Sequence, residues 1–323
     1  MKTLLKKTLT FIVALIFTSN LMAKTIYVNA SATGSNNGTS WANAYTSPQS
    51  ALNAAVDADQ IWIAKGIYKP SSANDLTDSP RYYHFKFPWT QIKLYGGFAG
   101  TETAINQRLN SGFGEANETV FSGDIGVQGD YSDNCYHVVR MYSVYFPTTV
   151  DGVTIKDGNA NGSGEYAYGG GLYCQITSAT FNNVTFNQNK AIRGGGAYLS
   201  GKYNSTASPF FRNCNFTNNA VTDLGGGLYS VICDPIFENC KLTNNTATLT
   251  SGTTTTGRGG GFYFETSKPM LYGVLIANNA AGEYGGGIYC KQGTIGINYS
   301  TVVKNSGGGI YVNSFTYNPG TGG

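Results

Sequence analysis

Hydrophobic and polar positions repeat along the second half of the chain with fixed short offsets. One unit has an apolar residue, a second apolar residue five positions later and, three positions further on, usually an asparagine. Its copies are Val150/Ile155/Gly158, Phe181/Phe186/Asn189, Phe211/Phe216/Asn219, Phe237/Leu242/Asn245, Leu271/Ile276/Asn279 and Ile297/Val302/Asn305. Successive copies begin 31, 30, 26, 34 and 26 residues apart. The unit is therefore constant while the segments between units vary, and insertions are expected in loops.

A second unit lies between these copies and consists of three glycines, one variable residue and a tyrosine. It occurs at Gly169–Tyr173, Gly194–Tyr198, Gly225–Tyr229, Gly259–Tyr263, Gly285–Tyr289 and Gly307–Tyr311. Because side chains alternate along a strand, the residues that flank each tyrosine share one face and the tyrosine takes the other. The flanking pairs, such as Leu172/Cys174 and Phe262/Phe264, are mostly apolar. They predict a buried face, with the tyrosines pointing outward as a ladder.

Repeats of this length, with a constant core and variable loops, are typical of solenoids. They are rich in Gly, Asn, Thr, β-branched and aromatic residues and lack a 3.6-residue apolar stripe, so they predict strands rather than helices. The sequence therefore predicts an all-β fold, a parallel β-helix with one coil per repeat. The asparagines that share one offset are expected to stack at a turn and hydrogen-bond along the axis. They are Asn189, Asn219, Asn245, Asn279 and Asn305.

The part of the chain that precedes the repeats is expected to cap this solenoid. Ser47 followed by Pro48 predicts the start of a short amphipathic helix that runs to Val56. Such a helix would cover the apolar end and the unpaired strand edges of the first coil. Residues 24–149 are interpreted as this cap with irregular first coils, and residues 150–323 as regular repeats of the same domain.

Strands of the irregular first coils are expected at residues 61–64, 92–98, 119–124 and 137–140. The last residues, 317–323, supply no second cap. This predicts either an incomplete chain or a further module after it.

Residues 1–23 have the features of a secretory signal peptide. Three lysines precede an apolar run from Leu9 to Phe17, which is too short to span a bilayer, and a short polar region ends at Ala23. Cleavage is expected after Ala23, with a retained anchor as the alternative. No later segment is apolar enough for a transmembrane helix, so the mature chain is predicted to be exported and soluble.

Charge argues against a nucleic-acid partner. Loss of the three leader lysines changes 21 basic residues to 18, which equals the 18 acidic residues. The mature chain then has no net positive charge with which to bind phosphates.

The six cysteines are interpreted as reduced core residues, with a disulfide framework as the alternative. Cys214 and Cys240 occupy equivalent positions in successive repeats, where other copies carry Val184, Val274 and Ser300. Stacked small side chains in register approach the disulfide geometry poorly. No CxxC pair or Cys/His cluster suggests a metal site.

Two sets of motifs resemble known families. The glycine unit resembles the repeats of polymorphic outer membrane proteins, as do Phe211-Arg212-Asn213, Asn218-Asn219-Ala220 and Asn278-Asn279-Ala280. The first third is similar to secreted bacterial proteins of the pectate-lyase-like superfamily in residues 26–29, 41–45, 61–68, 94–98 and 122–125. The resemblance implies a right-handed parallel β-helix at the surface of a Gram-negative bacterium, often followed by a C-terminal sorting or anchoring module. That superfamily includes lyases, hydrolases, adhesins and spacers, so the resemblance implies a fold rather than an activity.

Candidate chemistry is sparse. Polysaccharide cleavage needs paired carboxylates, or carboxylates that hold a cation beside a base, and the acids of the regular repeats fall at unlike offsets. Asp124, Asp130 and Asp133 lie on a glycine-bearing stretch and are a candidate Ca²⁺ site, with an ordinary turn as the alternative. His84 and His137 are the only histidines, and His137, beside Val138, is expected to be structural.

The tyrosine ladder has two interpretations. It either fixes the register of the coils by stacking or forms an exposed aromatic track that binds glycans. The sequence predicts a non-catalytic cell-surface or extracellular module for adhesion or polysaccharide binding. The candidate contact residues are Tyr173, Tyr198, Tyr229, Tyr263, Tyr289 and Tyr311.

Two alternatives to this function stay open. One is a polysaccharide lyase or glycoside hydrolase of the same fold, with chemistry around Asp124, Asp130, Asp133, His137 and Arg140. The other is an inert spacer. The sequence specifies neither the ligand nor the oligomeric state.

Overall fold

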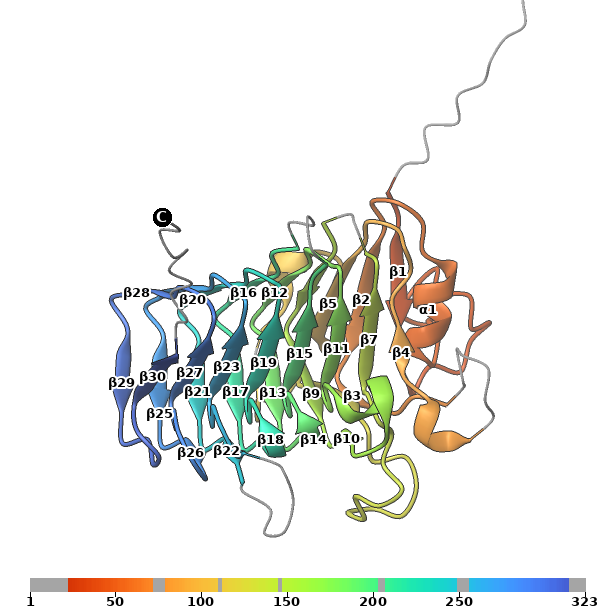
Figure 1. Cartoon of the computed structure of the whole chain (residues 1–323). Helices are drawn as coiled ribbons and strands as arrows, with labels where there is room; N and C mark the ends of the chain where they lie inside the picture. Colours follow the sequence, from red (N-terminus) through yellow and green to blue (C-terminus); the bar gives the residue numbers. More distant parts are fainter. Residues whose placement is uncertain are drawn as a thin grey trace, which may run out of the picture.

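The structure is a computed structural model that describes residues 23–71, 79–109, 112–144, 147–202, 207–248 and 256–313. In these ranges the chain winds into coils that stack along one axis, from the red N-terminal end to the blue end in Figure 1. Neighbouring strands pair in parallel from coil to coil. The predicted all-β parallel β-helix is confirmed. The expected signal peptide, except Ala23, and the tail after Asn313 lie outside the described residues.

Four parallel sheets form the walls of the β-helix. Sheet A contains β1 (Thr25–Val28), β2 (Gln60–Ala64), β5 (Lys93–Phe98), β8 (Thr149–Asp151), β12 (Thr180–Asn182), β16 (Phe210–Arg212), β20 (Ile236–Glu238), β24 (Met270–Tyr272) and β28 (Gly296–Asn298). Sheet B contains β3 (Gly66–Tyr68), β6 (Thr119–Ser122), β9 (Val153–Lys156), β13 (Thr185–Asn187), β17 (Asn215–Thr217), β21 (Lys241–Thr243), β25 (Leu275–Ala277) and β29 (Thr301–Val303).

The other two sheets complete each coil. Sheet D contains β10 (Asn159–Ala160), β14 (Lys190–Arg193), β18 (Ala220–Leu224), β22 (Thr246–Ala247) and β26 (Ala280–Ala281). Sheet C contains β4 (Phe85–Lys86), β7 (Val139–Tyr142), β11 (Leu172–Gln175), β15 (Ala197–Ser200), β19 (Leu228–Val231), β23 (Phe262–Glu265), β27 (Ile288–Lys291) and β30 (Ile310–Asn313). Short 3₁₀ turns occur at Pro80–Tyr82, Ile105–Gln107 and Gly164–Ala167. The strands expected in the first coils are observed as β2, β5, β6 and β7.

The predicted cap helix is α1 (Pro48–Ala54), which lies at the N-terminal end of the stack (Figure 1). Its N-cap residue Ser47 accepts a hydrogen bond from Gln49 N at 3.2 Å, and Pro48 supplies the first turn, where its missing N–H costs nothing. Ala51 and Leu52 are fully buried, and the helix packs on β1, β2 and β4. None of the described helices is long and apolar enough to cross a membrane.

The inward register of sheet C is as predicted. Leu172 pairs with Ala197, Ala197 with Leu228, and the same column continues through Phe262 and Ile288. The glycines that precede these strands also pair between coils, since Gly171 N donates to Gly195 O at 3.1 Å. In sheet B, phenylalanines from successive coils stack face to face, with centroids of Phe186 and Phe216 4.6 Å apart. These residues form one continuous hydrophobic core.

The predicted asparagine stack is confirmed. Asn219 Nδ2 donates to Asn245 Oδ1 at 2.9 Å and also to Phe186 O at 2.9 Å. The same Asn245 oxygen accepts Asn219 N at 3.1 Å. This pattern runs from Asn189 to Asn305, and Gly158 N donates to Asn189 Oδ1 at its head. Each amide therefore satisfies backbone groups at the turn between sheets B and D.

All six cysteines are free and buried. Cys214 Sγ contacts Phe181 O at 3.3 Å and Cys240 Sγ contacts Phe211 O at 3.4 Å. Burial raises the pKa of the Cys214 thiol well above its usual value. The structure therefore agrees with the interpretation of these residues as reduced core residues.

Candidate functional site

The outer face of sheet C carries one continuous column of large side chains. Register pairs Lys86 with Arg140 and Arg140 with Tyr173. The column then continues through the five other ladder tyrosines to Tyr311. The tyrosine ladder therefore begins with two cationic rungs, which were not predicted from the sequence.

The six tyrosines form a ladder, but it is not an exposed track. Ring centroids of successive rungs lie 5.3, 5.5, 5.3, 4.9 and 5.0 Å apart. None of the six belongs to the main core, and Tyr229, Tyr263 and Tyr289 form a separate cluster with Tyr198 packed against it, so the ladder does point outward. However, Tyr263 and Tyr289 are only 2% exposed, Tyr173 and Tyr229 are also buried, and Tyr311 at the last rung is 38% exposed. The expectation of an aromatic surface open to a ligand along the whole ladder is wrong.

The side chains of residues just before the glycine units cover the ladder. Tyr168 stacks on Tyr198 with centroids 4.9 Å apart. Arg193 Nε binds Asp223 Oδ2 at 2.6 Å, and Arg258 binds Glu283 at 2.7 Å while lying 5.4 Å from the Tyr289 ring. These residues precede the glycine units, and each ion pair joins two coils. This arrangement supports the interpretation that the ladder fixes coil register.

Glu265 connects the ladder to the next coil. Its carboxylate accepts a hydrogen bond from the Tyr229 hydroxyl at 2.7 Å and another from Lys291 Nζ at 2.7 Å. Burial alone would raise the pKa of Glu265, but the hydrogen bonds from Lys291 and Tyr229 outweigh it and hold the pKa below its usual value. The ionised form is therefore the one that stabilises the fold.

We expect replacement of Glu265 by Gln to destabilise the protein at neutral pH and to matter little in acid. A carboxyl whose folded-state pKa is depressed contributes stability above its unfolded pKa of about 4.5 and loses it as pH falls through the folded value. The difference in melting temperature between the wild type and E265Q should therefore shrink below about pH 4. Thermal melts followed by circular dichroism over this pH range measure it.

The matched control for Glu265 is Glu238, which pairs with Arg212 at a more exposed position. E238Q should change the melting temperature little at any pH, because exposed ion pairs contribute little. If E265Q and the wild type have the same melting temperature at pH 7, the ionised Glu265 carboxylate does not stabilise the fold and the prediction is wrong.

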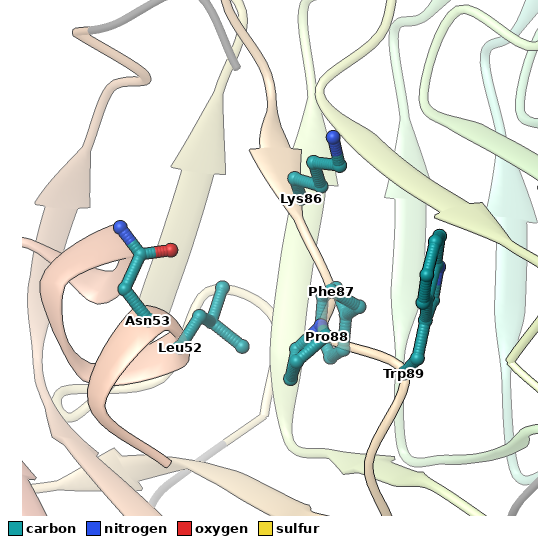
Figure 2. A pocket seen from close by; sticks show the side chains of 6 residues that line it. All are labelled: Leu52, Asn53, Lys86, Phe87, Pro88 and Trp89. Carbon is teal, nitrogen blue, oxygen red and sulfur yellow. The ribbon is translucent and has the colours of Figure 1, made fainter. Parts of the chain in front are cut away.

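Two adjoining hollows open at the N-terminal end of the sheet C column. The larger, about 430 Å³, is lined by Leu52, Asn53, Lys86, Phe87, Pro88 and Trp89. The smaller, about 160 Å³, is lined by Lys86, Phe87, Trp89, Arg140 and Tyr142. Figure 2 shows Leu52 and Asn53 coming from α1, and the other four residues of the larger hollow coming from β4 and the segment after it. Lys86, Phe87 and Trp89 line both hollows.

The path of the chain after β4 explains the position of Trp89. Phe87 N still donates to Arg140 O at 3.2 Å, and the Phe87 ring is buried. Pro88 has no N–H, so pairing with the sheet ends and the chain turns outward. The Trp89 indole consequently stands on the surface, 68% exposed, and Figure 2 shows it projecting from the loop beside Lys86.

The hollows are lined by aromatic, apolar and cationic side chains. Trp89 and the exposed Tyr142 offer aromatic surface, and Lys86 and Arg140 carry positive charge. Arg140 Nη2 also binds Glu165 Oε2 at 2.9 Å. None of the residues that line either hollow is acidic, so the pair of carboxylates that glycoside hydrolysis requires is not found in their lining.

The other predicted site residues lie on a loop and in an aromatic stack. Asp124, Asp130 and Asp133 follow β6, and their carboxylates accept backbone N–H bonds of the same loop. His137 is buried, its Nδ1 lies 3.0 Å from Gly169 O, and its ring packs on Tyr173. Within the part of the chain that the structure describes, no group of three or more His, Cys, Asp or Glu side chains is placed to hold a metal ion.

Trp89 is not among the site residues predicted from the sequence. The available signal was a proline and a tryptophan directly after the apolar pair Phe85 and Phe87. That order predicts an aromatic side chain leaving a strand end. Neither Leu52 nor Arg140 could be placed beside Trp89 without the coil register.

The stacked parallel coils define the class of this protein as a parallel β-helix. Residues 137–319 match the family described as "Right handed beta helix region", which is more than half of the 323 residues. The chain therefore belongs to the right-handed β-helix family. This confirms the fold implied by the resemblance to the pectate-lyase-like superfamily.

Two solved structures are similar over most of the chain. The crystal structure of pectate lyase Pel9A has a TM-score of 0.43 and 13% identity, and the match covers 90% of this chain and 80% of that one. A rhamnogalacturonan lyase has a TM-score of 0.37 and 13% identity, with coverage of 84% and 74%. No protein of curated function has a matching sequence.

Proposed function

We propose that this protein is an exported, non-catalytic β-helix of the cell surface or extracellular space that binds polysaccharide at the hollows beside Trp89. The observation that carries the proposal is the 68% exposed indole, held between two concave surfaces at the end of a rigid sheet. An exposed tryptophan beside a hollow gives a ligand a large apolar contact at a small entropy cost.

The geometry moves the contact surface away from the tyrosine ladder. A sugar ring cannot stack on Tyr263 or Tyr289, because these rings are buried between their neighbours. Trp89 and Tyr142 remain accessible beside the first rungs of that column. A glycan chain lying across the first coils would contact the indole with one ring and extend toward Tyr142.

The charge of the lining favours acidic glycans over neutral ones. Lys86 and Arg140 both line the smaller hollow, and cationic side chains form charge-assisted hydrogen bonds with carboxylates or sulfates. Lys86 is exposed, whereas the Arg140 side chain is only 14% exposed and is paired with Glu165. The electrostatic part of binding therefore depends mainly on Lys86 and should weaken as the salt concentration rises.

Replacement of Trp89 by Ala tests this function. Binding of the mature protein to a panel of acidic and neutral polysaccharides, measured by affinity electrophoresis and calorimetry, should fall at least about tenfold, or about 1.4 kcal/mol. Tyr299 at the far end of the β-helix is almost fully exposed, so Y299A is the matched loss of an aromatic side chain and should bind like the wild type.

Three outcomes would reject the proposed function. Equal binding by W89A and the wild type would remove the hollow as the site. New reducing or unsaturated ends after incubation with a glycan would support the enzyme alternative. Failure of the wild type to bind any glycan of the panel would support the spacer alternative.

Export is a separate part of the proposal and has its own test. Expression in a Gram-negative host should release a chain that begins at Lys24, as measured by mass spectrometry of the extracellular and membrane fractions. A chain that keeps residues 1–23 in the cytoplasm would contradict export.

A further inference from the structure

A closed loop joins β6 to β7. Cys135 N donates to Gly123 O at 3.0 Å and closes the neck of the loop. Within it, Asp124 Oδ2 accepts Gly129 N at 3.3 Å and Asp133 Oδ2 accepts Val127 N at 2.7 Å. Both carboxylates therefore reach across the loop and face its interior.

Three oxygen atoms of this loop are buried without a hydrogen-bond partner among the described residues. They are Oδ1 of Asp124, Oδ1 of Asp133 and Oδ1 of Asn134. Asn134 is 1% exposed, and its Nδ2 donates to Asp157 O, in the turn after β9, at 2.6 Å. The nitrogen of the amide is therefore satisfied by that turn, while its oxygen has no donor in the described part of the chain.

Buried oxygens without a donor require an explanation, because a buried unpaired polar atom is costly and a buried charge is more costly still. Two carboxylates and a carboxamide oxygen on one glycine-bearing loop are the ligand types that Ca²⁺ prefers. Mg²⁺ is less suited, since it demands a small octahedral shell and gives up water reluctantly.

We propose that the loop from Gly123 to Cys135 binds a single Ca²⁺ ion through Oδ1 of Asp124, Asp133 and Asn134. Backbone carbonyls and water complete the coordination shell. The ion would neutralise the charges of the two carboxylates. This site is independent of the glycan-binding hollows.

The proposed ligand set differs from the three aspartates singled out in the sequence. Asp130 is fully exposed at the loop tip, and its Oδ1 accepts Ser132 N at 2.8 Å. Asn134 takes its place as the third ligand. The sequence pattern could not make this distinction, because the direction of each side chain depends on how the loop closes.

Calcium binding should fix the loop against the next coil. Tyr131 of the loop donates its hydroxyl to Gln188 O at 3.0 Å, and Lys190 Nζ lies 3.6 Å from the centre of the Tyr131 ring. An ordered loop keeps these contacts, so the ion stabilises the folded chain by mass action. Tyr131 also lies where it can sensitise the luminescence of Tb³⁺, which binds to Ca²⁺ sites.

The test uses the mature protein after removal of metal with a chelator. Calorimetry with CaCl₂ should show one site per chain, the melting temperature should rise with Ca²⁺ but little with Mg²⁺, and Tb³⁺ should give tyrosine-sensitised emission that Ca²⁺ displaces. Asp124→Asn and Asp133→Asn should each weaken Ca²⁺ binding at least about tenfold, because each removes a charged ligand.

Asp130→Asn is the matched control, since it removes the same charge from the same loop and should bind Ca²⁺ like the wild type. The two ligand variants should fold as well as the wild type in chelator, because asparagine keeps an oxygen for the loop N–H and removes a buried charge. Absence of Ca²⁺ binding by the wild type, or an equal loss in D130N and D133N, would overturn the proposal.

Discussion

Replacement of Gly226 by alanine should destabilise the protein by about 3 kcal/mol or more, which is the upper end of what overpacking costs. A Cβ atom at this position would lie 2.6 Å from Thr246 O and closer still to Gly260 O. Both atoms are backbone atoms in the coil wall, so neither can rotate away. The two coils would have to separate locally, which breaks the ladder bond between Gly226 N and Gly259 O.

The melting temperature is the measure of this effect. For a chain of this size about 3 kcal/mol corresponds to a fall of several degrees, on the order of 5 °C. The matched control is Gly112→Ala, since a Cβ there would meet only Glu115 Cγ at 3.5 Å. If G226A melts at the same temperature as G112A and the wild type, the coils have room for a methyl group at Gly226 and the prediction is wrong.

The glycines of one unit are needed for different reasons. Gly225 has a positive φ of 71°, a conformation that side chains with a Cβ rarely adopt. Gly226 has an ordinary φ but lies against the neighbouring coil on the same side as Thr246. Conformational freedom explains the first position and close approach of backbones explains the second.

Replacement of Asn245 by alanine should cost about 3 to 5 kcal/mol. The side chain donates to Phe216 O at 2.8 Å and to Asn279 Oδ1 at 2.9 Å, while its oxygen accepts both Asn219 N and Asn219 Nδ2. Alanine leaves these buried partners unsatisfied, and each such group costs about 1 to 3 kcal/mol. Water cannot easily replace the amide, because Asn245 is fully buried.

Asn305 provides the control for Asn245 at the same offset in the last described coil. It accepts Asn279 N and Nδ2 and donates to Ile276 O, as the interior members do. It is, however, partly exposed, so water can satisfy the groups left by alanine. N305A should therefore melt closer to the wild type than N245A, as measured by circular dichroism, and equal losses would contradict a stability that depends on burial of the stack.

The two proposals concern opposite properties of the surface. The Trp89 hollows offer accessible aromatic and cationic groups to a ligand from solution. The loop from Gly123 to Cys135 instead encloses oxygens that solvent does not reach. Loss of Ca²⁺ binding in D133N would leave the glycan test at Trp89 unaffected, and the reverse holds for W89A.

The sequence by itself determined the coil architecture and its register. A tyrosine or asparagine that recurs at a fixed offset must meet its equivalent in the next coil if the coils stack, so Tyr198 beside Tyr229 and Asn219 beside Asn245 followed from spacing alone. Alternation along a strand likewise assigned Leu228 to the core and Tyr229 to the outer face. Short-range periodicity carries this information because a solenoid uses only contacts between neighbouring repeats.

Only the tertiary structure decided which outward side chains solvent can reach. Tyr263 and Trp89 both point away from the core, yet Tyr263 is buried under neighbouring rings and Trp89 stands free of the sheet. The difference arises from residues outside the repeated units. These are the residues just before the glycine units, such as Arg193 and Arg258, and Pro88, where the chain leaves the sheet. Exposure depends on all segments that pack around a side chain, and such contacts between unlike segments leave no periodic trace in the sequence.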